Sequence, residues 1–244
     1  MLKKLKAIRS LKKLFFKWSD GKRADFPKLS VKVRSELVSF GVPTKIKVND
    51  QGIEGGGKRL TPTALHQLVK EKGDQVVFID GRNKREAAIG KFKNAVVFDV
   101  DHTRDFPKEI KNPKYQSLKH KTLVTYCTGG IRCEVLSKLM LDEGYQDVYQ
   151  LDGGIVKYLE KYEDKGLWEG SLFVFDGRMS VDPSESTSPI GVCSHCQGKT
   201  KNYLNCSNPA CNELVLICQE CAGKQKLWCP NCQPVKQQNA ANLH

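Results

Sequence analysis

Residues 122–133 read TLVTYCTGGIRC: an apolar run, a cysteine, two glycines, an arginine and a second cysteine. The run Thr122–Tyr126 has the length and composition of a strand buried in a parallel sheet. A helical pattern follows it and ends at Gly144. The sequence therefore predicts a strand that delivers Cys127 into a tight loop at the start of a helix.

The loop after this strand has the composition of an anion site. Glycines let backbone N–H groups point at the sulfur, and the helix start adds the positive end of its dipole. Both effects favour thiolate over thiol, so the pKa of Cys127 should lie below its usual value of about 8.5. Cys127 and Arg132 are the candidate catalytic residues, and the loop between them is Thr128, Gly129, Gly130 and Ile131.

Cys133 lies in the first turn of the predicted helix, where a cysteine commonly packs into a core. The alternative is a resolving thiol that reacts with an oxidised Cys127. A change in the oxidation products of Cys127 in Cys133→Ser would support this second role.

Strands and helices alternate on both sides of this loop. The predicted strands are Val76–Asp80, Ala95–Asp99, Thr122–Tyr126 and Val148–Leu151. One helix begins at Thr61-Pro62 and stops at Gly73, and another follows Asp152-Gly153-Gly154. The pattern predicts an α/β domain whose parallel sheet is covered by helices on both faces, with active groups at the carboxyl ends of the strands.

Three segments resemble the rhodanese family. VVFIDGRNKREAAIGKF (residues 76–92) resembles its Asp-x-Arg…Glu…Gly element, which lies here at Asp80, Arg82, Glu86 and Gly90. CTGGIR resembles the active loop of sulfurtransferases, and LDGGIVKYLE (151–160) their closing Gly-Gly turn. The resemblance assigns Asp80 and Arg82 supporting roles. Rhodanese-like phosphatases have one residue more in the active loop, and this difference disfavours a phosphatase. Lys91 stands after Gly90 at a position where many rhodaneses have a histidine.

A second resemblance covers nearly the whole chain in order. KLSVKVRSELVSFG (28–41), CTGGIRCE, VYQLDGGIVKYLE and FVFDGRMSV (173–181), followed by a cysteine-rich tail, look like the bacterial tRNA uridine hydroxylase family. The resemblance implies oxidation of the wobble uridine of tRNA to 5-hydroxyuridine, with molecular oxygen as co-substrate. It also implies that Cys127 is the catalytic thiolate and that the anticodon region of tRNA is the partner.

The N-terminal fifty residues are strongly basic, with fourteen Lys and Arg against four Asp and Glu. Such a stretch suits a phosphate-rich partner. Residues 1–48 combine an apolar helical stripe over 2–18 with an alternating strand pattern at Leu29–Arg34. We interpret them as a partial α+β, ferredoxin-like segment, whereas relatives begin with a complete small α/β domain.

Eight of the ten cysteines follow the pattern C-x2-C-x9-C-x4-C-x6-C-x2-C-x7-C-x2-C. This spacing predicts two structural Zn²⁺ sites of four thiolates each. Sequential pairing would group the first four cysteines, whereas interleaved pairing, which we favour, joins Cys193 and Cys196 to Cys218 and Cys221. Iron–sulfur ligation, disulfides and ligation by His195 are less consistent with this spacing. The predicted ligands are Cys193, Cys196, Cys206, Cys211, Cys218, Cys221, Cys229 and Cys232.

The expected division of the chain follows from these patterns. After the segment 1–48 come a glycine-rich linker (49–58), the rhodanese-like catalytic domain (59–170), a strand with a linker (171–190), the cysteine-rich zinc module (191–234) and a disordered tail (235–244). No apolar run is long enough to span a bilayer, and the basic start lacks a signal-peptide core. We therefore expect a cytoplasmic protein with no membrane association and no obligate protein partner.

Two other functions stay open on the residues alone. A sulfurtransferase that carries a persulfide on Cys127 fits the loop equally well, but the basic segment and the cysteine-rich tail fit it less well. A zinc-based adaptor with a vestigial rhodanese fold is the third possibility, which the intact Cys127 loop argues against. For the hydroxylase, the sequence does not choose between addition of the thiolate to C6 of uridine and prior oxidation of Cys127.

Overall fold

The computed structural model describes residue 7 and residues 32–43, 46–49, 52–224, 226–229 and 231–232. The predicted helix over 2–18, the first part of the predicted strand at Leu29–Arg34 and the tail 235–244 lie outside these residues, apart from Ala7. Within the described part, Lys32–Arg34 form no strand. Phe40, at 1% exposure, instead anchors this segment against Phe106, with 5.8 Å between the ring centroids.

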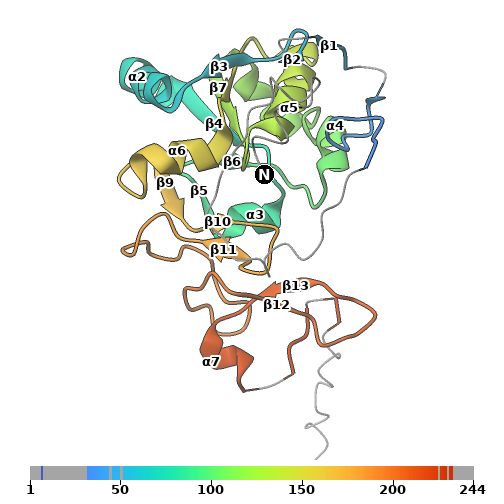
Figure 1. The fold of residues 1–244 in the computed structure, drawn as a ribbon, viewed down its shortest axis with the longest axis vertical. Helices are drawn as coiled ribbons and strands as arrows, with labels where there is room; N and C mark the ends of the chain where they lie inside the picture. The colour runs from blue at the N-terminus through green and yellow to red at the C-terminus, as the bar shows by residue number, and fades with distance from the viewer. Residues whose placement is uncertain are drawn as a thin grey trace, which may run out of the picture. The chain divides into compact units, whose positions relative to one another are not determined.

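A five-stranded sheet, all of whose pairings are parallel, forms the centre of the fold (Figure 1). Its order is β3-β8-β7-β4-β6. The central strand β7 lies between β8 and β4, and all five of its residues are buried. The strands are β3 (Lys58–Leu60), β8 (Asp147–Leu151), β7 (Thr122–Tyr126), β4 (Val76–Asp80) and β6 (Val96–Val97).

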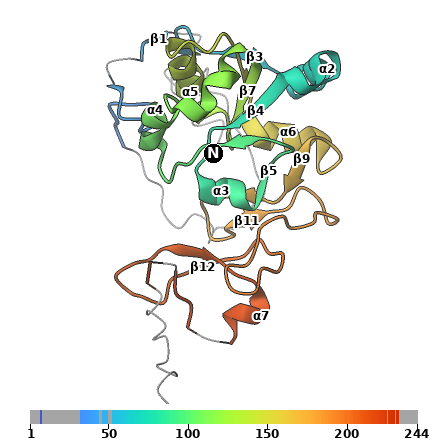
Figure 2. The same cartoon turned by 180° about the vertical axis from the view of Figure 1, so that it is seen from behind.

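Successive residues of the central strands enter two different cores. Ile79 and Leu123 pack with α5 (Ile131–Asp142) and α4 (Phe106–Glu109). Phe78 and Val124 pack with α2 (Pro62–Lys72) and α6 (Gly154–Tyr162). Since side chains alternate across a strand, the two cores lie on opposite faces of the sheet. The predicted rhodanese-like arrangement, with helices on both faces, is confirmed, and Figures 1 and 2 show the two helix layers.

Several predicted boundaries agree with the structure and others do not. Thr61 caps α2 by accepting the N–H of Ala64, and α2 ends at Lys72, just before Gly73. The strand predicted at Ala95–Asp99 is shortened to Val96–Val97, because it pairs with β4 at only two positions. The expected linker contributes a hairpin of β1 (Val48–Asn49) and β2 (Gly52–Ile53), and its last residue begins β3.

The remaining elements are short helices, 3-10 turns and antiparallel strand pairs. Short helix α3 (Lys84–Ala88) follows β4, and three 3-10 turns cover Gly73–Gln75, Thr103–Asp105 and Pro113–His120. Antiparallel pairs join β5 (Gly90–Phe92) to β9 (Trp168–Gly170) and β10 (Leu172–Phe173) to β11 (Ser180–Val181). The cysteine-rich part contains β12 (Tyr203–Asn205), β13 (Leu214–Leu216) and α7 (Gln219–Ala222).

The cysteine-rich part has a small apolar core. Among the described residues, Val215, Ile217 and Leu227 are its buried aliphatic side chains, and they pack among the thiols. A core of this size cannot stabilise a fold by burial alone. Nowhere in the described ranges does a helix combine the length and apolar character needed to cross a membrane.

A candidate active site at Cys127 and two cysteine clusters

Cys127 follows directly after β7 and is only 2% exposed. The N–H of Gly130 donates to its Sγ over 3.2 Å. Gly130 adopts a φ of +91° and is the N-cap of α5, so the chain turns back toward the sulfur before the helix begins. The predicted strand, loop and helix therefore meet around the thiol.

The surroundings of Cys127 favour its thiolate. A hydrogen bond from the Cys133 thiol, the charge of Arg132 and the nearby backbone N–H groups together lower its pKa to about 6, although burial acts in the opposite direction. The lowered pKa agrees with the sequence prediction. At neutral pH the sulfur is consequently charged and nucleophilic.

Cys133 is fully buried in the first turn of α5. Burial and the neighbouring Cys127 raise its pKa well above the usual value, so Cys133 stays protonated and donates its S–H to the Cys127 sulfur. The sequence predicted core packing or a resolving role. It missed the donor role, because only the folded turn brings residues six apart into contact.

Arg132 is held by a carboxylate that the sequence analysis did not place in the site. Its two terminal nitrogens donate to the two oxygens of Glu86 over 2.6 and 2.7 Å. Glu86 is 1% exposed and sits in α3, whose N-terminus it caps together with Asn83. Arg132 also donates to the hydroxyl of Thr128 over 3.3 Å. Arg132 is partly buried, and its pairing with a buried carboxylate gives the guanidinium a defined direction, which a freely moving cation lacks.

Asp80 and Arg82, the predicted supporting residues, form a fully buried ion pair with bonds of 2.6 and 2.9 Å. Arg82 donates further to the carbonyls of Glu86 and Gly90, and Tyr126 donates to Asp80 over 2.7 Å. The two bonds from Arg82 to the backbone end on Glu86, within α3, and on Gly90, two residues after the helix. The pair therefore holds the helix that carries Glu86, and its contribution to the loop is indirect.

The Gly153-Gly154 turn forms the other wall of the loop. The N–H groups of Ile155 and Val156 donate to the carbonyls of Cys127 and Thr128 over 2.9 and 3.1 Å. A Cβ on Gly154 would lie 2.3 Å from the Cys127 carbonyl oxygen, so only glycine fits there. The sequence indicated this turn through family resemblance but not its contact with the loop.

Two loop residues differ from the buried sulfur in their exposure. Ile131 is 50% exposed, and Gly129 is partly exposed. The loop therefore carries an exposed apolar side chain, whereas its thiol is buried.

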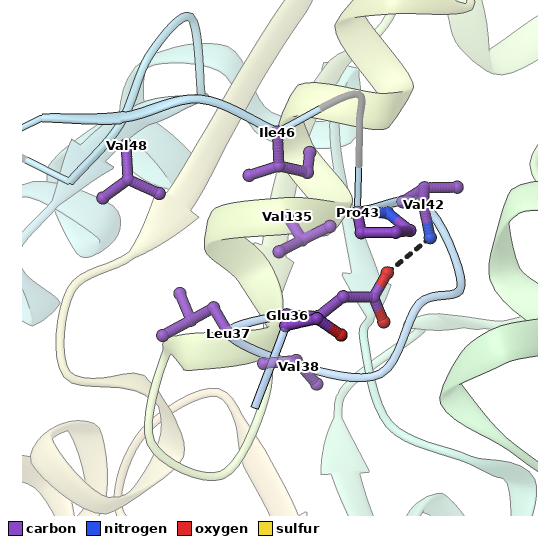
Figure 3. Close-up of a pocket in the computed structure, with 9 residues that line it drawn as sticks. Glu36, Leu37, Val38, Val42, Pro43, Ile46, Val48 and Val135 are labelled. Carbon is purple, nitrogen blue, oxygen red and sulfur yellow. Dashed lines mark hydrogen bonds between the residues drawn. The ribbon is translucent and has the colours of Figure 1, made fainter. Parts of the chain in front are cut away.

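A hollow lies between α5 and the described residues 35–43 and 46–48 (Figure 3). The carboxylate of Glu36 accepts the N–H groups of Val42 and Gly41 over 2.5 and 3.1 Å. Ser35 contributes a hydroxyl to the lining, and the other lining side chains are apolar: Leu37, Val38, Val42, Pro43, Ile46, Val48 and Val135. The Cys127 loop therefore remains the candidate reactive site.

Eight thiols of the C-terminal part gather into two clusters. Within each cluster, all four Sγ atoms lie within 4.8 Å of one another. Four thiolates about 2.3 Å from one Zn²⁺ would be about 3.8 Å apart, so the clusters fit a tetrahedral metal ion. The grouping is the interleaved one: Cys193, Cys196, Cys218 and Cys221 in one cluster, and Cys206, Cys211, Cys229 and Cys232 in the other.

Comparison with known families places two regions of the chain. The family described as Rhodanese-like domain matches residues 61–161, and the family described as Rhodanase C-terminal matches residues 169–233. Among solved structures, a rhodanese-like domain from Anabaena aligns with a TM-score of 0.38 at 15% identity, over 46% of this chain and 78% of that one.

Curated relatives are much more similar in sequence. The tRNA uridine(34) hydroxylase of Corynebacterium urealyticum is 55% identical over 217 residues, which is 89% of this chain and 73% of the relative. The protein of the same name from an Arthrobacter species is 57% identical over 218 residues, which is 88% of this chain and 73% of that relative.

Proposed function

The chain belongs to the tRNA uridine(34) hydroxylase family, and from this we propose that Cys127 is the thiolate with which it hydroxylates the wobble uridine of tRNA at C5, using molecular oxygen. The single observation that carries the assignment to Cys127 is the geometry of its loop: the N–H of Gly130, at the start of α5, donates to the sulfur over 3.2 Å and so favours the thiolate. The fixed guanidinium of Arg132 supports it.

The thiolate would act by adding to C6 of the uracil ring. The new C6–S bond turns the C4 carbonyl into an enolate and makes C5 electron-rich. Reaction of C5 with O₂ gives a hydroperoxide. An external dithiol then reduces it with two electrons and two protons and becomes a disulfide, which leaves a hydroxyl at C5 and releases water. Loss of the C5 proton and expulsion of the thiolate then restore the double bond. The alternative route, in which Cys127 is first oxidised, uses the same sulfur.

A buried thiol restricts how the base can reach it. Since Cys127 is 2% exposed, the wobble base must leave its stack and enter the site. Ile131 of the same loop is half exposed and could offer an apolar contact to a base that has left the stack. The formal charge of +13 suits attraction of the anticodon phosphates.

Zinc has a structural role in this proposal. The two cysteine clusters would each hold one Zn²⁺ through four thiolates. When bound, the ions would cross-link the module, because the small core around Val215 and Ile217 buries too little apolar surface to stabilise it alone. All steps of the chemistry remain at the Cys127 loop.

The test is replacement of the sulfur. In a strain lacking the gene, Cys127→Ser should restore no 5-hydroxyuridine derivative in digested tRNA, whereas the wild-type gene should restore it, as measured by nucleoside mass spectrometry. Under labelled oxygen gas the wild-type product should carry the label. An unlabelled hydroxyl would contradict the use of molecular oxygen, and product in Cys127→Ser would contradict the role of this thiolate.

Sulfur transfer is the second candidate, and the match of residues 61–161 to the rhodanese-like family favours it. It predicts that Cys127 accepts sulfur from thiosulfate as a persulfide and passes it to cyanide. Unchanged tRNA nucleosides in the deletion strain, together with thiosulfate:cyanide activity lost in Cys127→Ser, would favour this function over hydroxylation.

A further inference from the structure

Helix α3 contacts both the reactive loop and the cysteine-rich module. Figures 1 and 2 show it at the end of the sheet domain that faces β12 and β13. Two consecutive residues of this helix reach different partners. Glu86 binds Arg132 in the active loop, and Arg85 forms an ion pair with Glu213 of the module.

A second contact supports the same connection. The hydroxyl of Tyr203 donates to the backbone carbonyl of Arg85 over 2.8 Å. Tyr203 is 8% exposed and packs with Ile89, which follows α3, and with Phe173 of β10. The buried ring and its hydrogen bond define where α3 can lie relative to β12.

Both module residues are next to one cysteine cluster. Glu213 lies two residues after Cys211, and its carbonyl accepts the N–H of Cys206 over 2.7 Å. Tyr203 begins β12, the strand that leads into Cys206. A metal ion held by Cys206, Cys211 and their two partners would therefore define the positions of both contacts.

We propose that Arg85, Tyr203 and Glu213 are positioning residues that transmit the metal-held fold of this cluster through α3 to Arg132, and so keep Cys127 reactive. The proposal rests on the role of Cys127 stated above. Its physical basis is the bidentate pair between Glu86 and Arg132: if α3 shifts, the guanidinium moves with it, away from the sulfur whose charge it stabilises.

The experiment measures Cys127 itself in the full-length, zinc-loaded protein. Alkylation of the Cys127 peptide by iodoacetamide is followed by mass spectrometry between about pH 5 and pH 8, where a lowered thiol pKa titrates. In Tyr203→Phe and Arg85→Gln the midpoint should rise by about 0.3 to 1 unit, which slows alkylation two- to tenfold below the midpoint. Arg85→Lys, which keeps the charge, should restore part of the reactivity.

Lys84→Gln is the matched control, because it removes the same charge one residue earlier on α3. Its partners, Asp99 and Asp101, belong to the sheet domain, so its profile should match the wild type. Zinc content is measured for each variant. Tyr203→Phe removes a single hydroxyl and leaves the packed ring, so it tests the contact even where Arg85→Gln loses metal.

The outcomes separate this proposal from the one on which it rests. Wild-type profiles in both Tyr203→Phe and Arg85→Gln, with zinc retained, would overturn the coupling through α3. An equal shift in Lys84→Gln would overturn it as well, because general charge would then explain the effect. A wild-type midpoint near the ordinary thiol value would instead contradict the thiolate role of Cys127.

Discussion

The proposed reactivity of Cys127 rests on the N–H of Gly130, which donates to its sulfur over 3.2 Å, and on the neighbouring thiol of Cys133, which lowers its pKa. Because the thiolate reacts and the thiol does not, alkylation of Cys127 should increase as the pH rises through about 6. Removal of a donor makes the thiolate less stable. In Cys133→Ala we expect a higher midpoint, measured from the pH dependence of the alkylation rate.

Cys133→Ser separates the donor role from the resolving role. Its hydroxyl still donates a hydrogen bond to Cys127, so the pH midpoint should stay closer to the wild type than in Cys133→Ala. If Cys133 also resolves an oxidised Cys127, Cys133→Ser should change the oxidation products while it preserves the midpoint. An unaltered midpoint in Cys133→Ala would show that the S–H donor has no effect.

Between elements, the start of α6 determines the shape of the reactive loop. Gly154→Ala would place a methyl group 2.3 Å from the Cys127 carbonyl oxygen and 2.6 Å from the Gly130 nitrogen. The loop must move, and with it the N–H that points at the sulfur. We expect loss of stability of about 1–3 kcal/mol and a strong decrease in Cys127 alkylation, measured by urea unfolding and by mass spectrometry.

Gly73→Ala is the matched control for this prediction. Gly73 also has a positive φ, +50°, but nothing lies within 4 Å of the added Cβ. Because its ψ of −126° also lies outside the left-handed helical region, the variant should lose about 1–3 kcal/mol from the backbone conformation and leave the reactivity of Cys127 unchanged. Equal reactivity in the two variants would contradict the role assigned to the α6 turn.

For the molecule as a whole, the sheet domain and the cysteine-rich module are stabilised by different kinds of core. The sheet domain has large apolar clusters on both faces, whereas the cysteine-rich module has three buried aliphatic residues and eight thiols. Removal of metal by a chelator should therefore unfold residues 191–232 and leave β4, β7 and β8 folded. Hydrogen exchange should show protection lost in the module and retained in these strands.

The structural role of zinc also predicts how many ions each chain binds. Two clusters of four thiols predict two Zn²⁺ per chain and loss of one in Cys206→Ser or in Cys218→Ser. A visible absorbance typical of iron–sulfur clusters, or a module that stays protected after metal removal, would contradict the structural zinc assignment.

Local sequence was sufficient for much of the fold. Strand β4, strand β7, the Thr61 cap of α2 and the stop at Gly73 all agree with the predictions, because each depends on a few neighbouring residues. Strand β3 could not be predicted in the same way. Its three residues, KRL, are mainly exposed, and they form a strand only because β8 offers a parallel edge.

The amino-acid order alone predicted the candidate thiol and its glycine loop, and it determined the alternating α/β pattern and a cysteine count that fits two tetrahedral metal ions. Each is a property of residues close together in the chain. Tertiary structure alone revealed the pairing of Arg132 with Glu86 and the contact of α3 with the module, and it decided between the two thiol pairings in favour of the interleaved one that the sequence analysis preferred. These partners are separated in sequence, and spacing carries no information about which distant side chains burial will bring together.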